Sequence, residues 1–424
     1  MKFSTIKGFK DILPEEIHYW QIIENKARNL FEKFGFREIR TPILEKTELF
    51  NRSIGQETDI VSKEMYTFKD SKGRSLSLRP EATASVVRAY IQNRLYQKGA
   101  IQKFYTIGPM FRHERPQKGR FRQFHQINVE EFGDPGPMSD VELIIMAIKF
   151  FEKIGLKDDL TLNINSLGCS ECRPLFKEKL KEYLKAKTNS FCPDCQRRAL
   201  LNPLRIFDCK VESCQKNIKD APLILDYLCN KCKSHFQFIK DILRNFKINF
   251  DVNPRLVRGL DYYTRTAFEF HTEELGAQNA VAGGGRYDGL VNLLGGPDHP
   301  AIGFAIGMER IITLLQEKRP IKPYTPDLFI AALGEKAKKI AFELMIQIRD
   351  KGMWIEMEYE NKSLKAQMKR ADKIRAKNVL ILGEDELRSE KAILRDMRTG
   401  HQKEISINIK EVIKNINKEP KEIH

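Results

Sequence analysis

The chain has 424 residues, enough for two or three domains, and its composition is 41% hydrophobic and 31% charged, as in soluble globular proteins. It contains no run of about 18 uncharged apolar residues, which argues against a membrane role. The first residues, MKFSTIKGFKDILP, lack the apolar stretch of a secretory signal. We therefore expect a cytoplasmic protein whose cysteines are reduced.

Basic residues exceed acidic ones. Lysine and arginine total 73 against 57 acidic residues, which gives a formal net charge of +16. This excess favours a polyanionic partner such as a nucleic acid. A solvated charged surface gives the same composition, so charge alone does not decide between the two.

The first third of the chain mixes predicted helices and strands. Apolar residues from Trp20 to Phe34 recur at steps of three and four, which predicts a helix over residues 15–34. Alternation predicts a strand over residues 36–44, with Pro42 near an edge or an end. Further strands are expected at 65–68 and 75–78, and further helices at 82–93 and 140–154.

A basic hairpin is predicted between these helices. Strands over 104–114 and 124–132 flank a loop rich in Arg, Lys, Gln, Pro and Gly. Side chains two residues apart on a strand share a face, so Arg112 and Glu114 should lie together. On the returning strand the shared face would carry Phe124, Gln126, Asn128 and Glu130.

The hairpin chemistry favours a nucleotide. An arginine fork suits a phosphate, and Phe124 can stack on a base. The alternative is an exposed, ion-paired hairpin. Because the clustered basic residues would repel one another without an anion, we favour the phosphate interpretation.

The segment over residues 169–247 differs from its surroundings and contains every cysteine of the chain. The cysteines form three CxxC pairs and one CxxxxC pair: Cys169 and Cys172, Cys192 and Cys195, Cys229 and Cys232, and Cys209 and Cys214. A CxxC turn brings two thiolates to one ion, so we expect structural zinc, with the pairing between sites left open. The alternative is buried, reduced cysteine that packs as a small hydrophobic residue.

The pattern in the last part of the chain predicts further elements of the first domain, followed by a separate domain. Strands over 256–271 and 301–306 precede a helix over 308–316 and a proline-punctuated linker near residues 320–326. Beyond the linker, strands at 327–333, 354–359 and 379–382 alternate with helices at 336–351 and 363–376. This βαβαβ pattern predicts a parallel sheet. A hairpin at 393–397 and 404–407 and a final helix follow.

Six short stretches carry a resemblance to a known family. GFREIRTP (35–42), FRHE with the basic loop and RQFHQ (111–126), and AIGFAIGMER (301–310) resemble the three motifs of class II aminoacyl-tRNA synthetases. LRPEAT (78–83), RGLDYYTR (258–265) and GGGRYDGL (283–290) resemble signatures of the histidyl-tRNA synthetases. Ala82 and Ala301 replace glycines that are more usual there, but both are small. The resemblance covers nearly the whole chain.

The resemblance implies the architecture. We expect an α+β fold whose core is the antiparallel sheet of class II synthetases with flanking helices, interrupted by an insertion domain and followed by an α/β anticodon-binding domain. The expected ranges are 1–168 and 248–320 for the catalytic core, 169–247 for the cysteine-rich insertion and 325–424 for the anticodon-binding domain. A homodimer is also implied.

The resemblance implies a histidine–tRNA ligase, which uses ATP and Mg²⁺ to form histidyl-adenylate and then transfers histidine to the 3' end of tRNA(His). Fixed cations near the phosphates would stabilise the transition state selectively, and the resemblance assigns catalysis to Arg258 and Arg112. It assigns ATP to Arg112, Glu114, Phe124 and Arg310. It assigns histidine to Glu81, Thr83, Arg112, Gln126, Glu130, Arg258, Tyr262, Tyr263 and Tyr287. Arg115 and Gln117 at the hairpin tip would read the extra 5' guanosine of the tRNA.

Two other functions fit part of the sequence. A non-catalytic paralogue, such as the regulatory subunit of ATP phosphoribosyltransferase, shares the fold, but it would lack part of the third motif or the C-terminal domain. A zinc-dependent RNA-binding module would account for the cysteines and the charge. It would leave the four residues Arg112, Glu114, Arg258 and Arg310 unexplained.

Overall fold

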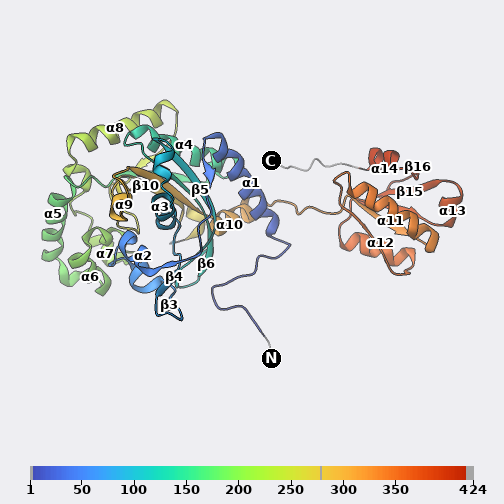
Figure 1. Cartoon of the computed structure of the whole chain (residues 1–424), viewed down its shortest axis with the longest axis horizontal. Coiled ribbons are helices and arrows are strands. Elements are labelled where there is room, and N and C mark those ends of the chain that lie inside the picture. The colour runs from blue at the N-terminus through green and yellow to red at the C-terminus, as the bar shows by residue number, and fades with distance from the viewer. Residues whose placement is uncertain (1–2, 277–278, 417–424) are drawn as a thin grey trace. The chain divides into compact units, whose positions relative to one another are not determined.

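The structure is a computed structural model of the chain, and it describes residues 3–276 and 279–416. The chain divides into two compact units, Met1–Ile321 and Lys322–His424 (Figure 1). Residues 417–424 of the predicted anticodon-binding domain lie outside the described residues, as do 1–2 and 277–278 of the predicted catalytic core. Within the described ranges, no helix is both long and apolar enough to cross a membrane.

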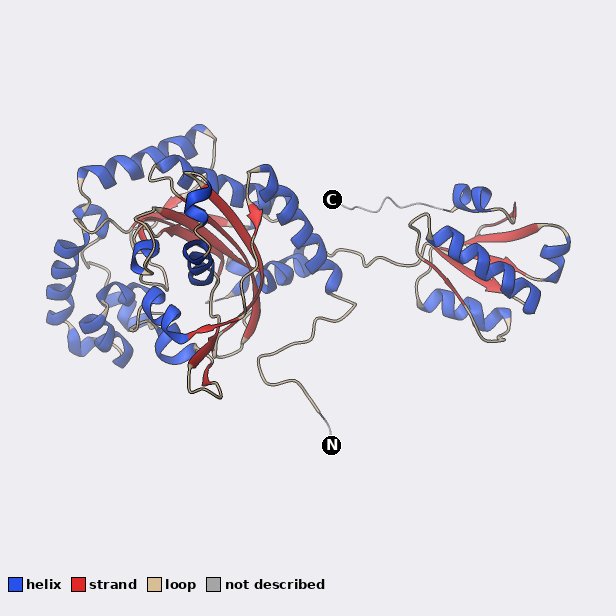
Figure 2. Cartoon of the chain, viewed as in Figure 1, coloured by secondary structure: helices blue, strands red, loops and turns tan. Residues whose placement is uncertain are grey.

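An eight-stranded sheet forms the centre of the first unit (Figure 2). In spatial order its strands are β1 (Arg37–Glu38), β5 (Gln102–Phe111), β6 (Gln123–Phe132), β11 (Ala301–Gly307), β10 (Ala280–Arg286), β9 (Thr264–His271), β7 (Thr161–Ser166) and β8 (Asp251–Val252). The six inner strands are antiparallel to one another. The short edge strands β1 and β8 run parallel to their neighbours. The expected antiparallel core with flanking helices is confirmed.

Four helices cover one face of this sheet (Figure 1). They are α1 (Ile17–Lys33), α4 (Pro137–Ile154), α8 (Asn230–Asn245) and α10 (Met308–Lys318). Their apolar sides pack against inward-facing residues of the sheet, including Ile127 and Val129 of β6. Because successive strand residues point to opposite faces, the polar residues Gln126, Asn128 and Glu130 lie on the other face. The alternation of β6 therefore separates core from cleft.

The polar face of the sheet is partly covered by shorter elements. These are α2 (Thr47–Ile54), the π-helical turn η1 (Ile60–Glu64), α3 (Thr83–Gln92), η2 (Leu95–Lys98), α9 (Leu290–Leu293) and a small antiparallel sheet of β2 (Leu44–Lys46), β4 (Ser75–Leu78) and β3 (Thr67–Lys69). The apolar side of α3, with Val86, Val87 and Tyr90, packs against Phe132 of β6. This packing leaves the middle of the face open.

Two predicted strands of the first unit are wrong in part. Residues 36–44 form no continuous strand: β1 joins the large sheet, and β2 joins the small one. Pro42, which has no N–H to donate, lies in the segment where the chain changes sheets. Residues 253–263 follow an irregular path, and only Thr264–His271 of the predicted strand 256–271 is extended. The glycine-rich β10 and the strand β7 were not predicted.

The cysteine-rich segment is helical. It contains α5 (Arg173–Ala186), η4 (Thr188–Ser190), α6 (Pro193–Leu201), η5 (Pro203–Asp208), α7 (Glu212–Asn217) and η6 (Ile224–Tyr227), and it is preceded by η3 (Lys157–Asp159). These helices enclose a small apolar cluster of their own, to which the cysteines belong. Helix α8 also lies within the range expected for the insertion, but it packs on the large sheet through Phe236, Ile239 and Leu243.

The second unit is a five-stranded sheet with helices. In spatial order the strands are β13 (Ile355–Met357), β12 (Leu328–Ala332), β14 (Asn378–Leu382), β15 (Lys391–Asp396) and β16 (Gln402–Ser406). The helices are α11 (Glu335–Arg349), α12 (Leu364–Lys373), α13 (Glu384–Arg388) and α14 (Ile409–Asn415). Strand β12 is parallel to both β13 and β14, which confirms the expected βαβαβ arrangement. The predicted hairpin is β15 and β16.

Candidate active site

A polar cleft with a volume of about 440 Å³ opens on the uncovered face of the large sheet. Every side chain that the sequence assigned to ATP or histidine lines it. These residues are Glu81, Thr83, Arg112, Glu114, Phe124, Gln126, Glu130, Arg258, Tyr262, Tyr263, Tyr287 and Arg310. The fold therefore brings together residues from β6, from the first turns of α3 and α10 and from several connecting loops.

Two carboxylates are buried in one part of the cleft. Glu81 accepts hydrogen bonds from the backbone amides of Thr83 and Ala84, both at 2.8 Å, at the start of α3. Glu130 accepts a hydrogen bond from the Thr83 hydroxyl at 2.6 Å and another from the Tyr287 hydroxyl. Burial raises the pKa of both carboxyls, that of Glu130 to about 8. Two buried carboxylates so close together favour a cationic ligand group.

Three tyrosines adjoin the carboxylates. The ring of Tyr262 lies 4.8 Å from that of Tyr263 and 5.5 Å from that of Tyr287, measured between centroids. The Tyr262 hydroxyl donates to Glu81 at 3.4 Å. Burial raises the pKa of all three phenols, so they remain neutral hydrogen-bond donors. The result is a buried wall that can hydrogen bond with a polar ring.

Arg112 lies in a loop and not on a strand, because β5 ends at Phe111. Its Nε donates to the carbonyl of Pro80 at 2.8 Å, and its Cζ lies 5.3 Å from the centre of the Phe124 ring. Glu114 lies 3.9 Å from Arg112 and forms a closer ion pair with Arg120. The expected strand register of Arg112 and Glu114 is wrong, but both side chains still reach the cleft.

Arg258 lies on the irregular segment 253–263. Its guanidinium is paired with Glu269 of β9, and its Cζ lies 5.6 Å from the centre of the Tyr263 ring. The backbone of Gly283 on β10 lies directly beneath it. A Cβ atom at Gly283 would be 2.3 Å from Nη1 of Arg258. Glycine at this position therefore makes room for the arginine.

Arg310 adds a third cation from the first turn of α10. Its Nη1 donates to the carbonyl of Ala280 on β10. Burial lowers the pKa of Arg310, and burial together with the neighbouring Arg310 lowers the pKa of Arg120 to about 10. A helix N-terminus carries partial positive charge, so this part of the cleft suits an anion. Arg120 was not assigned a role from the sequence, because the basic loop offered several equivalent candidates.

Some buried polar atoms of the cleft lack a hydrogen-bond partner within the part of the chain that the structure describes. They are Oε1 of Gln126, Nδ2 of Asn128 and Nε of Arg258. Most buried polar groups in proteins are paired. These atoms are therefore suitable points of attachment for a polar ligand.

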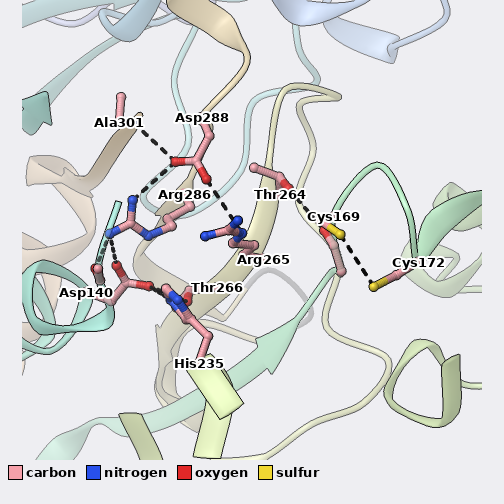
Figure 3. A network of polar contacts seen from close by, with 12 residues as sticks. Asp140, Cys169, Cys172, His235, Thr264, Arg265, Thr266, Arg286, Asp288 and Ala301 are labelled. Atoms are coloured by element: carbon pink, nitrogen blue, oxygen red, sulfur yellow. Dashed lines mark hydrogen bonds and ion pairs between the residues drawn. The ribbon is translucent and has the colours of Figure 1, made fainter. Parts of the chain in front are cut away.

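Arg286, which directly precedes the cleft residue Tyr287 in the chain, belongs to a buried ion-pair network (Figure 3). The fully buried guanidinium of Arg286 lies 2.7 Å from Asp140 of α4 and 3.2 Å from Asp288. His235 of α8 contacts the same Asp140 carboxylate at 2.7 Å. The network links the end of β10, next to Tyr287 in the chain, to the helices α4 and α8. The motif GGGRYDGL contains Arg286, but the motif alone does not show that its partners are Asp140 and His235.

The two residues predicted to bind tRNA do not line this cleft. Arg115 and Gln117 are exposed in the loop between β5 and β6. Gln117 and Arg120 form a tight backbone pair, with N···O distances of 3.1 and 2.9 Å. The predicted tRNA contacts thus lie at the surface, apart from the small-molecule residues.

The cysteines form two groups of four. The first CxxC pair meets the last, and the two middle pairs meet each other: Cys169, Cys172, Cys229 and Cys232 form one group, and Cys192, Cys195, Cys209 and Cys214 form the other. The sulfurs of each group all lie within 4.8 Å of one another. Backbone amides of Cys192 and Cys229 donate to sulfurs of their own groups at 3.2 and 3.1 Å. Each group has the donor set of a tetrahedral thiolate site.

Comparison with known proteins identifies the family. Residues 8–311 match the family described as histidyl-tRNA synthetase. The chain belongs to the histidyl-tRNA synthetase family. Residues 327–419 match the anticodon-binding domain, so both units of the chain are accounted for.

Individual histidyl-tRNA synthetases cover almost the whole chain. A histidine–tRNA ligase of Desulfatibacillum aliphaticivorans is 56% identical over 405 residues, or 96% of each chain. One of Desulfosudis oleivorans is 54% identical over 405 residues, covering 95% of this chain and 96% of the relative. The crystal structure of apo S. aureus histidyl-tRNA synthetase is 36% identical with a TM-score of 0.80, covering 96% of this chain and 98% of that one. The α+β class II fold expected from the sequence motifs is confirmed.

Proposed function

We propose that the protein is a histidine–tRNA ligase that forms histidyl-adenylate from histidine and ATP and then transfers histidine to tRNA(His). The observation that carries this proposal is the polarity of the cleft. Buried carboxylates, Glu81 and Glu130, lie in one part, and the guanidinium groups of Arg112, Arg258 and Arg310 line another. This arrangement supports binding of an amino acid whose ammonium and carboxylate point in opposite directions.

In the activation step, a carboxylate oxygen of histidine forms a bond to the α-phosphorus of ATP as the bond from that phosphorus to pyrophosphate breaks. Negative charge develops on the α-phosphate and on the leaving group. Arg112 and Arg258 would stabilise the charge on the α-phosphate, and Arg310 would hold the terminal phosphate. Phe124 would stack on the adenine.

Histidine would be recognised at both ends. Glu81 and Glu130, with Thr83 and Gln126, offer acceptors to the ammonium, and the unpaired Oε1 of Gln126 is one of them. The imidazole would face the tyrosines Tyr262, Tyr263 and Tyr287. A site whose buried polar groups need partners rejects amino acids that cannot supply them. This supports specificity for histidine.

In the transfer step, a hydroxyl at the 3' end of tRNA attacks the carbonyl carbon of the adenylate, and AMP leaves. The exposed Arg115 and Gln117 lie in the loop between β5 and β6, where they would meet the 5' guanosine of the acceptor stem. The second unit would bind the anticodon. We further propose that the protein works in the cytoplasm as a homodimer.

The family implies Mg²⁺ with the ATP. The cleft carboxylates Glu114 and Glu269 are already paired with Arg120 and Arg258. This pairing fits an ion held mainly by phosphate oxygens and water, and Glu114 is the carboxylate among the residues assigned to ATP that could contact it. Bound there, Mg²⁺ would neutralise phosphate charge.

We also propose that each cysteine group binds one structural zinc. Four sulfurs at about 2.3 Å from a tetrahedral zinc lie about 3.8 Å apart. The observed Sγ–Sγ distances fit this: 3.6 Å for Cys169–Cys172, 3.9 Å for Cys169–Cys229 and 3.9 Å for Cys192–Cys209. Metal analysis of protein purified under reducing conditions should give two zinc ions per chain, and a metal-free folded protein would end this proposal.

The test of the main proposal is ATP–pyrophosphate exchange measured with each of the twenty amino acids. Exchange with histidine alone supports it. Exchange with no amino acid would instead point to the non-catalytic paralogue. The third motif and the anticodon-binding domain, one of which the paralogue would lack, are both present here.

A further inference from the structure

The insertion domain forms part of the wall of the catalytic cleft. Arg198 of α6, Arg205 and Asp208 of η5, and the adjoining Lys210 line the cleft together with Arg258. These residues are separated from the catalytic motifs by tens of positions in the sequence.

Arg205 contacts the backbone of the proposed catalytic arginine. Its Nη1 donates a hydrogen bond of 2.9 Å to the carbonyl oxygen of Arg258, and it also pairs with Asp208. Its Nη2 lies 3.9 Å from Asp59 of the segment before η1. Because Nη1 is hydrogen bonded to protein acceptors and the side chain is only 12% exposed, Arg205 is held mainly by contacts within the protein.

The backbone of Arg258 needs such support. Residues 253–263 connect β8 to β9 without joining a sheet, so their carbonyls are not fixed by strand neighbours. Side chains fix some of the segment: Asn165 donates to the carbonyl of Leu256 at 2.9 Å, and Asn202 donates to Asp261 at 2.7 Å. Arg205 supplies the corresponding bond at Arg258 itself. A displacement of about 1 Å in a catalytic group can reduce a rate 100-fold.

Arg205 is itself held firmly. The short helix η5 ends at Asp208, directly before Cys209 of the second cysteine group. Cys209 is buried, and its sulfur accepts a hydrogen bond from the amide of Val211 at 3.4 Å. Before η5, Asn202 contacts Asp261 of the catalytic segment. The segment carrying Arg205 is thus fixed at both ends.

We propose that Arg205 is a positioning residue for histidine activation: by bonding to the Arg258 carbonyl, it holds the Arg258 guanidinium where the reacting groups meet. The insertion domain therefore acts on adenylate formation. This inference rests on the proposed function, since it requires Arg258 to serve histidine activation.

The test is histidine-dependent ATP–pyrophosphate exchange by the full-length Arg205→Ala protein. Because a misplaced Arg258 still allows ATP to bind, kcat should fall about 10–100-fold while the KM for ATP changes little. Arg205→Lys, which can still donate one hydrogen bond, should recover part of the loss. A rise in the KM for ATP with unchanged kcat would overturn the positioning role and make Arg205 a substrate ligand.

A matched control removes another contact between the insertion domain and the rest of the catalytic domain. Lys63 of η1 pairs with Asp194 of α6 at 3.5 Å, and both side chains are more than half exposed, at 54% and 61%. Lys63→Ala should leave exchange unchanged. Zinc content and melting temperature are measured for every variant, so that unfolding is not mistaken for mispositioning.

The possible outcomes separate the two claims. If the wild type and Arg205→Ala exchange equally well with histidine, the positioning role is wrong and the proposed function stands. Absence of exchange by the wild type overturns both. If Arg205→Ala does not fold, it is replaced by Arg205→Met, which has a long side chain but donates no hydrogen bond. A kcat of Arg205→Met equal to that of Arg205→Lys would contradict the inference.

Discussion

At the scale of single residues, Arg258 combines burial, an ion pair with Glu269 and a place beside the tyrosine wall. Replacement by alanine should reduce histidine-dependent pyrophosphate exchange about 100–1,000-fold, because a fixed cation at developing charge contributes this much. The control is Arg52→Ala, which removes an arginine that is 63% exposed and paired along its helix with Glu48. Undiminished exchange by the Arg258 variant would remove the basis of the catalytic assignment.

Glu130 offers a test that depends on pH. Burial raises the pKa of its carboxyl from 4.5 to about 8. Between these pH values the unfolded chain releases a proton that the folded protein retains, so rising pH progressively favours unfolding. Glutamine cannot ionise, and the hydroxyls of Thr83 and Tyr287 can accept from its amide as well as donate.

We therefore expect the melting temperature of ligand-free Glu130→Gln, relative to the wild type, to increase by about 2 °C or more from pH 6 to pH 9. The same variant should bind histidine more weakly, since a carboxyl can ionise when it meets the ammonium, whereas an amide cannot. The measurement is thermal unfolding of both proteins across this pH range. A constant difference between the two melting temperatures would contradict the raised pKa.

At the scale of elements, two adjacent glycines of β10 face different neighbours. A Cβ at Gly283 would meet the flexible end of Arg258, whereas a Cβ at Gly284 would lie 2.2 Å from the carbonyl oxygen of Gly303 in the neighbouring strand. Gly283→Ala should therefore lower exchange at least tenfold with little loss of stability, because the guanidinium can move. Gly284→Ala should cost about 3 kcal/mol of unfolding free energy, because the backbone must move. Denaturant unfolding and exchange assays on both variants check this contrast. A similar loss of unfolding free energy in Gly283→Ala and Gly284→Ala would refute it.

Local pattern predicted the elements that follow simple periodicity. The alternation along β6 placed Gln126 and Glu130 on one face, and the structure places both in the cleft. The sequence of strand β10 does not predict a strand, because it is rich in glycine and poor in the β-branched residues typical of strands. The segment around Arg258 was mistaken for a strand because its aromatic and aliphatic residues suit one, although they pack against the tyrosine wall and the insertion.

At the scale of the whole molecule, the two units have separate hydrophobic cores. The apolar clusters of the second unit contain only residues from its own range. A protein of residues 1–321 should therefore fold and retain histidine-dependent exchange. It should lose at least about tenfold in kcat/KM for tRNA, or 1.4 kcal/mol, because the anticodon contacts are absent. Aminoacylation and exchange assays on the same preparation test this, and equal charging by both proteins would contradict the role of the second unit.

Long-range pairing marks the limit of prediction at this scale. The CxxC spacings indicated thiolate sites, but they do not fix which pairs meet, because that depends on how α5, α6 and α7 fold between them. Arg205 carried no local signal for its role, since its partner Arg258 lies 53 residues away. Motif resemblance placed the small-molecule residues well because each lies within a recognisable stretch.

The meeting of the first and last cysteine pairs makes the insertion a closed loop. Cys169 and Cys172 adjoin Cys229 and Cys232 at its base, so an ion bound there would join the two places where the loop leaves and re-enters the catalytic domain. A protease that cut once between Cys172 and Cys229 would leave both fragments attached to the same metal. In such a nicked enzyme the metal would hold the fragments at this point in addition to the large sheet, whose strands come from both fragments.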